Sequence, residues 1–229
     1  MEGKDLLIRC SSIGAIMTNS RSKAVPLSQT CKGHIIERFN EIEFGISNQF
    51  TNNYVKKGID VEDESINLAT RVNNFEFVLK NEERFSNGYI SGIPDALTDD
   101  YVLEVKSSWQ LHTFPMMDEV NKNKGYDWQV QGYLWLTDKE RGYLSYCLVD
   151  TPEMIVQDEL LRVARKGGYI DLPEDVENEI RGNHMFGHIP EQVRCKTFEI
   201  HRDEEKIEQI KERIELCRDF YDELKTKLL

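Results

Sequence analysis

The sequence lacks several features that mark broad classes of protein. No apolar run approaches the roughly 18 residues needed to cross a bilayer, and the first residues, MEGKDLLIRCSS, contain no apolar segment of the secretory kind. The five cysteines are scattered, with no CxxC pair. This spacing argues against a zinc ribbon, an iron–sulfur cluster or a disulfide framework and favours reduced thiols in the core. We therefore expect an intracellular protein with no membrane partner.

Positive charge is also scarce. The chain has 29 Lys and Arg against 41 Asp and Glu, which gives a formal net charge of −12. A protein that simply coats nucleic acid needs Lys and Arg to neutralise phosphates, so this class is excluded. An enzyme with a local basic groove is not excluded, because acidic residues that gather metal ions would add to the negative total. No GxxxxGK[ST] loop is present, so the chain carries no ATP motor of that type.

The composition fits one globular domain with alternating helical and strand patterns. The chain has 229 residues, of which 39% are hydrophobic, enough for one sizeable core. Apolar spacing predicts helices in the first third, short strands rich in aromatic and β-branched residues next, and then a helix and a buried strand. We expect a mixed α/β sheet flanked by helices. The predicted helices are 11–18 (capped by a serine), 28–44, 52–72 and 126–138, and the predicted strands are 75–80, 87–93, 101–107 and 142–150.

The C-terminal stretch predicts a long helix that begins after Asp203, its expected N-cap. Apolar residues recur there at intervals of three and four. Packing of this stripe on its own domain is one interpretation, and a contact between subunits is the other. The stripe comprises Ile207, Ile210, Ile214, Cys217, Tyr221, Leu224 and Leu228.

The stretch 94–106, PDALTDDYVLEVK, gathers charged side chains beside an apolar pattern. Side chains alternate between the two faces of a strand, so Glu104 and Lys106 point one way and Val105 the other. Asp95 lies nine residues before Glu104. Two carboxylates and an amine on one side, with an apolar face behind them, predict a functional site. The alternative is a solvated edge hairpin, in which such charges are common.

These residue types suit phosphodiester hydrolysis. That reaction needs a metal ion that stabilises charge on phosphorus and on the leaving oxygen, and a poised water as nucleophile. Mg²⁺ is held by carboxylates and carbonyl oxygens, which Asp95, Glu104 and the Val105 backbone supply. Lys106 would reach the same space, where its amine either orients the attacking water or offsets negative charge in the transition state.

The same residues carry a resemblance to a known family. Pro94-Asp95 and Glu104-Val105-Lys106 resemble the PD-(D/E)XK nuclease motif. Gln129 and Tyr133, in WQVQGYLW, match the QxxxY helix motif of the branch that contains RecB-type nucleases and phage lambda exonuclease. Each motif alone is short, and their joint occurrence is what makes the match specific.

Two further segments extend the resemblance. Gly58 and Glu62, in GIDVEDESI, resemble the G-x-x-x-E helix of that branch. SSIGAIM, which contains Ser11, resembles the S-x-I-G opening of YqaJ-type viral recombinase nucleases. The motifs keep the family order across residues 9–150, and FEIHRDEEKIEQI resembles the family's closing strand and helix. The resemblance implies a restriction-endonuclease-like core, with a central mixed β-sheet flanked by helices and a long C-terminal helix.

The resemblance implies a role for each matching residue. Asp95 and Glu104 would bind the metal through their carboxylates and Val105 through its carbonyl, while Lys106 would be the catalytic lysine. Glu62 would add a carboxylate to the metal site, where it could also bind a second ion about 4 Å from the first. The metal would be Mg²⁺, with Mn²⁺ as a substitute.

The remaining matches face the substrate. Gln129 would hold the scissile phosphate or the Lys106 region. Ser11 and Arg9 would touch a phosphate near the cut, with the 5′-terminal phosphate as one candidate. Arg9 is the weakest of these matches, because the family's arginine usually lies further upstream of the serine. Arg21 is an alternative for the same role. Tyr133 is grouped with these DNA-facing residues, with a core position as its alternative.

Several of these residues have plainer interpretations. Glu62 lies in the charged run VEDESI, where a solvated helix face is ordinary and where Glu64 is a competing choice. Gln129 and Gln131 lie two apart and cannot share a helix face, so only one points at the site, and the family pattern selects Gln129. Ser11 has the role of a helix cap as its alternative.

A few polar residues outside the motifs are further candidates. His184 and His188 lie four apart and are followed by Cys195. They lack an HExxH signature and a rigid helix, so a loop near DNA or a subunit edge is favoured over a zinc site. The basic pieces 122–126 and 162–168 are candidates for phosphate contacts, although surface lysines usually serve solubility.

The expected function is that of a Mg²⁺-dependent exonuclease on linear double-stranded DNA. The resemblance implies 5′-to-3′ degradation that leaves a 3′ single strand for an annealing protein, a trimeric ring around DNA, and a phage or prophage protein in a bacterial host. The alternatives are an endonuclease or CRISPR-adaptation-like nuclease of the same fold, and an inactive DNA-end-binding protein. One domain is expected over 1–229, with N-terminal helices in 9–72, a catalytic core in 75–150 and a closing strand and helix in 193–229.

Overall fold

The computed structural model describes residues 3–22, 24–47, 52–76 and 78–229. Within these ranges no helix is long and apolar enough to cross a membrane. The helices are α1 (Ile13–Ile16), α2 (Gln29–Phe44), α3 (Asn53–Asp60), α4 (Glu62–Asn73), α5 (Lys124–Thr137), α6 (Glu153–Gly167), α7 (Glu174–Gly182), α8 (Glu191–Arg194) and α9 (Glu204–Leu228), with 3-10 turns η1 (Gly3–Asp5), η2 (Cys10–Ser12) and η3 (Leu111–Thr113). The strands are β1 (Ile8–Arg9), β2 (Phe85–Ser86), β3 (Ile90–Gly92), β4 (Ala96–Leu97), β5 (Tyr101–Ser107), β6 (Arg141–Cys147) and β7 (Cys195–His201).

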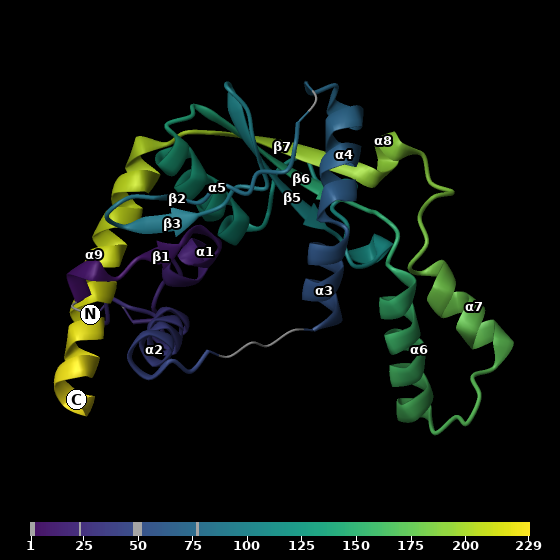
Figure 1. The fold of residues 1–229 in the computed structure, drawn as a ribbon, viewed down its shortest axis with the longest axis horizontal. Helices are drawn as coiled ribbons and strands as arrows, with labels where there is room; N and C mark the ends of the chain where they lie inside the picture. Colours follow the sequence, from purple (N-terminus) through teal and green to yellow (C-terminus); the bar gives the residue numbers. More distant parts are fainter. Residues whose placement is uncertain (1–2, 23, 48–51, 77) are drawn as a thin grey trace.

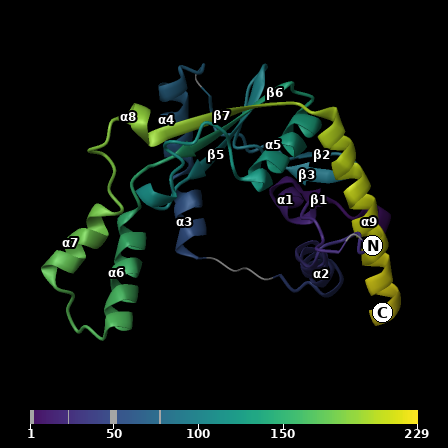
Figure 2. The ribbon, with the colours of Figure 1, turned by 180° about the vertical axis from the view of Figure 1, so that it is seen from behind.

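The elements are arranged as an arch (Figure 1). Strands β5, β6 and β7 cross its top, α2 and α9 form one side, and α3, α6 and α7 form the other. The view from behind shows the same two groups of helices on opposite sides of the sheet (Figure 2). The main sheet therefore connects two groups of helices that lie on opposite sides of the arch.

The main sheet has four strands in the order β4-β5-β6-β7. β5 and β6 are parallel, and the other two pairs are antiparallel. A smaller sheet of order β1-β3-β2 lies beside it, with β1 parallel to β3. The predicted mixed α/β sheet and long C-terminal helix are confirmed.

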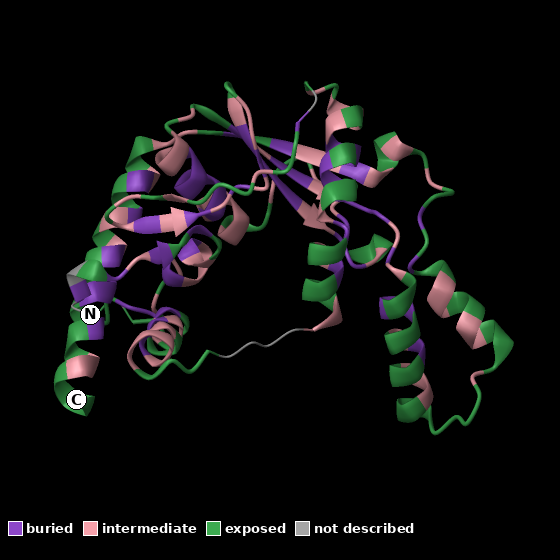
Figure 3. Cartoon of the chain, viewed as in Figure 1, coloured by how far each residue is buried: buried purple, intermediate pink, exposed green. Residues whose placement is uncertain are grey.

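Helices cover both faces of the main sheet. Val102 and Leu144 point to the face packed by α5, in a core that also includes residues of α1, α2 and α9. Leu103 and Val105 point to the other face and pack with α4. This alternation along β5 is the period of two expected for a strand, and it places Glu104 on the side of α5. Figure 3 shows buried residues along the strands, while α6 and α7 carry mostly exposed and intermediate ones.

Helix ends follow the predicted local chemistry in most places. Ser28 caps α2 by accepting a hydrogen bond from the Cys31 N–H at 3.0 Å, and Gly45 ends that helix with φ of 67°. Asp203 caps α9 as predicted, accepting from two backbone N–H groups. The first helix is shorter than predicted, and its N-cap residue Ser12 makes no side-chain capping hydrogen bond.

Two predicted elements differ from the structure. The helix expected over 52–72 is divided into α3 and α4, because Val61 leaves helical geometry with φ of −114° and ψ of 16°. The strand expected over 75–80 is not formed among its described residues, which contribute only the isolated bridge between Lys80 and Ala96. Residue 77 of this stretch lies outside the described residues.

The apolar stripe of α9 packs within the chain. Ile207, Ile210 and Ile214 are buried in the same core as α5 and the main sheet, as are Cys217 and Tyr221. Leu224 only packs at its edge and Leu228 is exposed. The stripe is therefore used by the helix's own domain, which favours the first of the two interpretations.

Candidate active site

The hairpin of β4 and β5 brings the two predicted carboxylates together. Ala96 pairs with Leu103 in the antiparallel register, so Asp95, directly before β4, lies beside Glu104. The Val105 N–H donates a hydrogen bond to Asp95 Oδ2 at 2.8 Å. This bond fixes the Asp95 carboxylate against β5.

Glu104 is the centre of the polar cluster and is only 2% exposed. Its Oε1 accepts from Lys106 Nζ and from Gln129 Nε2, the latter at 2.7 Å. Its Oε2 is buried, and no described residue hydrogen-bonds to it. A buried carboxylate oxygen without a partner is costly, so this atom is a candidate position for a ligand that the chain itself does not supply.

Gln129 is held in place by the helix on which it lies. Its Nε2 also approaches Tyr133 Oη, one turn later, at 3.1 Å. Tyr133 packs on Gly92, where a Cβ atom would come within 2.7 Å of the tyrosine ring. Tyr133 is 4% exposed, which favours the core position over the DNA-facing one. It supports Gln129 from the core, where it has no direct access to DNA.

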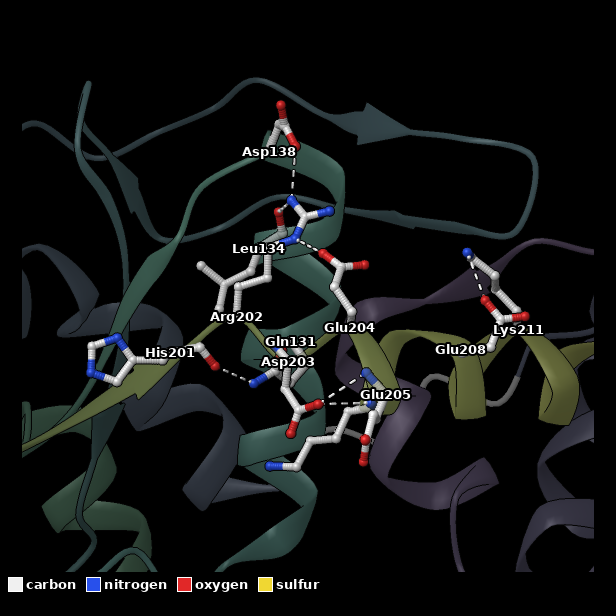
Figure 4. A network of polar contacts seen from close by, with 11 residues as sticks. Gln131, Leu134, Asp138, His201, Arg202, Asp203, Glu204, Glu205, Glu208 and Lys211 are labelled. Atoms are coloured by element: carbon white, nitrogen blue, oxygen red, sulfur yellow. Dashed lines mark hydrogen bonds and ion pairs between the residues drawn. The ribbon is translucent and has the colours of Figure 1, made fainter.

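Gln131, two residues after Gln129, contacts the backbone at the β7–α9 junction. Gln131 is buried on α5, where its Nε2 donates to the His201 carbonyl at 2.7 Å and its Oε1 accepts from the Asp203 N–H at 3.0 Å. Figure 4 shows this side chain between the end of β7 and the start of α9. The structure therefore separates the two glutamines as the family pattern requires, with Gln129 toward the carboxylates.

A cleft of about 410 Å³ opens beside the carboxylates. Glu62 reaches it from the first residue of α4, whereas Glu64 is not among its lining residues. Glu62 also pairs with Lys80, whose Nζ lies 3.1 Å from Glu62 Oε1. The lining residues are Tyr54, Val55, Gly58, Ile59, Glu62, Asp95, Val105, Lys106, Ser107 and Tyr126.

The pKa values of Asp95 and Lys106 are both shifted by burial and by neighbouring charges. Burial, the Glu104 charge and, to a lesser degree, the Glu62 charge raise the pKa of Asp95 well above its ordinary range. Burial alone would lower the pKa of Lys106, but the charges of Glu104 and Asp95 outweigh it and raise that pKa. The ammonium form of Lys106 therefore predominates at neutral pH.

The cluster has the donor chemistry of a divalent-cation site. In addition to burial, the charge of Glu104 raises the pKa of Asp95 by repulsion, and a hard cation would relieve this repulsion. The unpartnered Glu104 Oε2 gives such a cation a direct ligand, next to Asp95 and the Val105 backbone. Glu62, across the cleft, would add a carboxylate after release from Lys80. The residues present therefore fit Mg²⁺ or Mn²⁺.

None of the predicted phosphate-contacting residues lines this cleft. Ser11 is exposed in η2, and Arg21 is exposed in the bend after α1. Arg9, on β1, pairs with Glu41 at 2.6 Å and lines a separate depression of about 360 Å³. That depression also contains Arg38, Arg84 and Ser91. The structure does not bring Arg9, Arg21 and the carboxylates into one pocket, so their roles stay predictions.

The histidines of the 184–188 stretch do not converge. His184 is buried, its Nδ1 lies 3.0 Å from Thr151 Oγ1, and its ring packs edge-on against Trp109. His188 is exposed, and Cys195 interacts with the side chains of β7 and α4. Among the described residues, no group of three or more His, Cys, Asp or Glu side chains has the arrangement of a metal site.

Two residues beside the site, Tyr126 in the cleft lining and Lys80 paired with Glu62, were missed at the sequence level. Lys80 pairs with Glu62, and the Tyr126 ring centroid lies 4.8 Å from Lys106 Nζ. Tyr126 lies three residues before Gln129, so helical spacing was a usable signal for its position. Lys80 had no such signal, because it reaches the site through the bridge to Ala96.

Comparison with known proteins supports the same family. No protein-family model and no curated protein sequence matches the chain. A solved structure described as a phage-related exonuclease from Haemophilus somnus 129PT matches with a TM-score of 0.82 and 27% identity, over 98% of this chain and 97% of that one. The predicted resemblance to phage-type exonucleases is confirmed.

More distant structures share the fold. An alkaline exonuclease from Laribacter hongkongensis matches with a TM-score of 0.62 and 15% identity, over 96% of this chain and 92% of that one. The same enzyme in complex with dAMP matches with a TM-score of 0.62 and 14% identity, over 98% and 90% of the two chains. These matches show that the chain has the nuclease fold over nearly its whole described length.

Proposed function

We propose that this chain is a metal-dependent exonuclease that hydrolyses phosphodiester bonds at the ends of linear double-stranded DNA. Two independent lines support this proposal. The fold is shared with phage-related and alkaline exonucleases over nearly the whole chain. Asp95, Val105 and Lys106 line one cleft with Glu62, and buried Glu104 is hydrogen-bonded to Lys106 and Gln129.

The observation that carries the proposal is the unpartnered oxygen of Glu104. Its other oxygen already accepts two hydrogen bonds, and Asp95 lies beside it with a raised pKa. A purely structural cluster would satisfy both oxygens. A bound Mg²⁺ would polarise the phosphoryl oxygen and lower the pKa of its water.

Lys106, Gln129 and the apolar residues of the cleft would each have a separate role in the reaction. Lys106 is an ammonium at neutral pH, so it suits the stabilisation of negative charge on the phosphoryl group better than the removal of a proton from water. Gln129 fixes the Glu104 carboxylate and so orients the ligand set. The exposed apolar residues of α3 and the Tyr126 ring also line the cleft.

The finer features of the function are part of the proposal. They are degradation of the 5′-ended strand, Mg²⁺ as the physiological metal, a ring-shaped homo-oligomer around DNA, and delivery of the 3′ strand to an annealing protein in phage-type recombination within a bacterial host. An enclosing ring would reconcile DNA binding with a net charge of −12, because only the channel would need to be basic.

The test uses linear duplex DNA labelled at the 5′ or the 3′ end, with closed circular DNA alongside, in Mg²⁺ and in EDTA. We expect early release of the 5′ label in Mg²⁺ only, with circles left intact. Nicked or cut circles would identify an endonuclease instead. Binding that persists in EDTA without cleavage in Mg²⁺ would identify an inactive DNA-end-binding protein and contradict the proposal.

A further inference from the structure

Lys57 is a fully buried lysine on α3, a helix with several other residues in the cleft lining. It lies on α3, one residue before Gly58, with 0% of its surface exposed. Its Nζ donates to the Ser108 carbonyl at 2.8 Å and to the Trp109 carbonyl at 3.2 Å. The rings of Trp109 and Phe186 enclose the ammonium, with centroids 5.9 and 5.1 Å away.

This burial is costly for the protein. Within the described part of the chain, no carboxylate lies within ion-pair distance of the Lys57 ammonium. Burial lowers its pKa to about 8, against the opposing charges of Asp150 on the segment after β6 and of Glu64 on α4. A methionine would fill much of the same space without a charge, so packing alone does not account for a lysine here.

The two carbonyls that Lys57 holds have a particular place. They belong to the two residues that directly follow β5. The Ser108 N–H donates to the Cys147 carbonyl at 2.8 Å, which continues the parallel pairing of β5 and β6 by one residue beyond the end of β5. Lys57 thereby ties α3 to the end of the strand that carries Glu104 and Lys106.

A second contact ties α4 to the same segment. Ser65 is fully buried on α4, and its Oγ lies 2.8 Å from the Oγ of Ser107. Glu62 lies between the two tethers, five residues after Lys57 and three residues before Ser65. Val61, which ends α3 and begins α4, does not hold this turn by a side-chain cap. The position of Glu62 relative to β5 therefore depends on the contacts that flank it.

We propose that Lys57 and Ser65 are positioning residues that hold Glu62 at the metal cleft by fixing the α3–α4 turn to residues 107–109. This inference rests on the proposed function, because it assigns a role in the same metal site. Loss of either tether lets the turn move away from β5 and weakens the contribution of Glu62 to cation binding. Partners that orient metal ligands typically contribute about 10- to 100-fold in affinity or activity.

The test is a calorimetric titration of the full chain with Mn²⁺ in the absence of DNA. The variants are Lys57→Met and Ser65→Ala, with Glu62→Gln as the reference for loss of the ligand itself. Lys56→Met is the matched control, because Lys56 is the adjacent lysine of α3, with a half-exposed side chain that pairs with Asp158 at 3.8 Å. Thermal unfolding of each variant checks that it is folded.

We expect Mn²⁺ affinity to fall about 10-fold or more in Lys57→Met, Ser65→Ala and Glu62→Gln, and to stay at the wild-type value in Lys56→Met. Wild-type affinity in folded Lys57→Met and Ser65→Ala, or in Glu62→Gln, would overturn the inference. If Lys57→Met does not fold, Ser65→Ala decides alone. A wild-type chain that binds no Mn²⁺ and cuts no DNA contradicts the proposed function. If the wild type is active and Lys57→Met and Ser65→Ala bind Mn²⁺ with wild-type affinity, only the positioning role of Lys57 and Ser65 is contradicted.

Discussion

Two glutamines on α5 belong to polar regions of opposite character. Gln131 lies at the junction of β7 and α9, where its amide has a backbone donor and a backbone acceptor. Arg202 in the same junction pairs with Asp138 and Glu204, and Asp203 caps α9 (Figure 4). Each of these charges faces a partner of opposite sign or a backbone group, as a structural network requires.

The region of Gln129 has the reverse arrangement. Glu104 and Asp95 place like charges side by side, one Glu104 oxygen has no hydrogen-bond partner among the described residues, and the pKa of Asp95 is raised. The same residue types are used in both regions. The comparison teaches that satisfied polar contacts hold the fold together, whereas buried like charges and unpartnered atoms indicate where a ligand binds.

The largest expected effect comes from Asp95→Asn. We expect Mg²⁺-dependent cleavage of labelled duplex DNA to be abolished, because a metal ligand is lost, while the unfolding temperature stays the same or rises as the repulsion from Glu104 disappears. Asp203→Asn is the matched control in the junction, where asparagine is an equally good N-cap, so it should keep full activity. Wild-type cleavage by Asp95→Asn would refute the site.

Lys106→Ala should have the next largest effect. We expect the single-turnover rate at saturating DNA to fall about 10²-fold or more, the usual scale for lost electrostatic help, with DNA affinity by fluorescence anisotropy little changed. Lys206→Ala provides the comparison, since Lys206 pairs with Asp127 on the other side of α5 and lies outside the carboxylate cleft. Near-normal turnover by Lys106→Ala would show that the ammonium has no catalytic role.

The two glutamines themselves offer a direct contrast. Gln129→Leu should reduce turnover about 10-fold or more with a small effect on stability, because it frees the Glu104 carboxylate. Gln131→Leu should leave turnover per folded molecule unchanged and lower the free energy of unfolding by about 1 kcal/mol, since two partly buried backbone groups lose their partners. Urea unfolding and steady-state rates measure both. If Gln129→Leu and Gln131→Leu changed turnover and the free energy of unfolding equally, the assignment of Gln129 to the site and of Gln131 to the fold would be wrong.

The smallest effect concerns the pH dependence of stability. The pKa of Lys57 is about 8 in the folded chain against an ordinary value of 10.5. Between these pH values Lys57 is therefore protonated in the unfolded chain and largely neutral in the folded one. The contribution of Lys57 to the free energy of unfolding therefore increases as pH rises through this window and is constant below it. We expect urea unfolding at pH 7 to 10 to show this increase in the wild type relative to Lys57→Met. Parallel pH profiles would mean that Lys57 is not desolvated as described.

Much of the β4–β5 hairpin was predictable because its geometry is local. Alternation along β5 places Glu104 and Lys106 on one face, and the short connection from β4 brings Asp95 beside them. The caps Ser28 and Asp203 were predictable for the same reason, since a cap depends on neighbours two or three residues away. The strand predicted over 75–80 was wrong, because propensity alone does not provide a partner strand.

The amino-acid sequence by itself determined the motif, its order along the chain and the local elements that carry it, since these depend on spacing within a few residues. The tertiary structure alone decided the division of the helix at Val61, the pairing of Lys80 with Glu62 and the burial of Lys57. It also set Tyr133 in the core. These features depend on contacts between segments far apart in the chain, and their energies follow from burial and charge that no local pattern records.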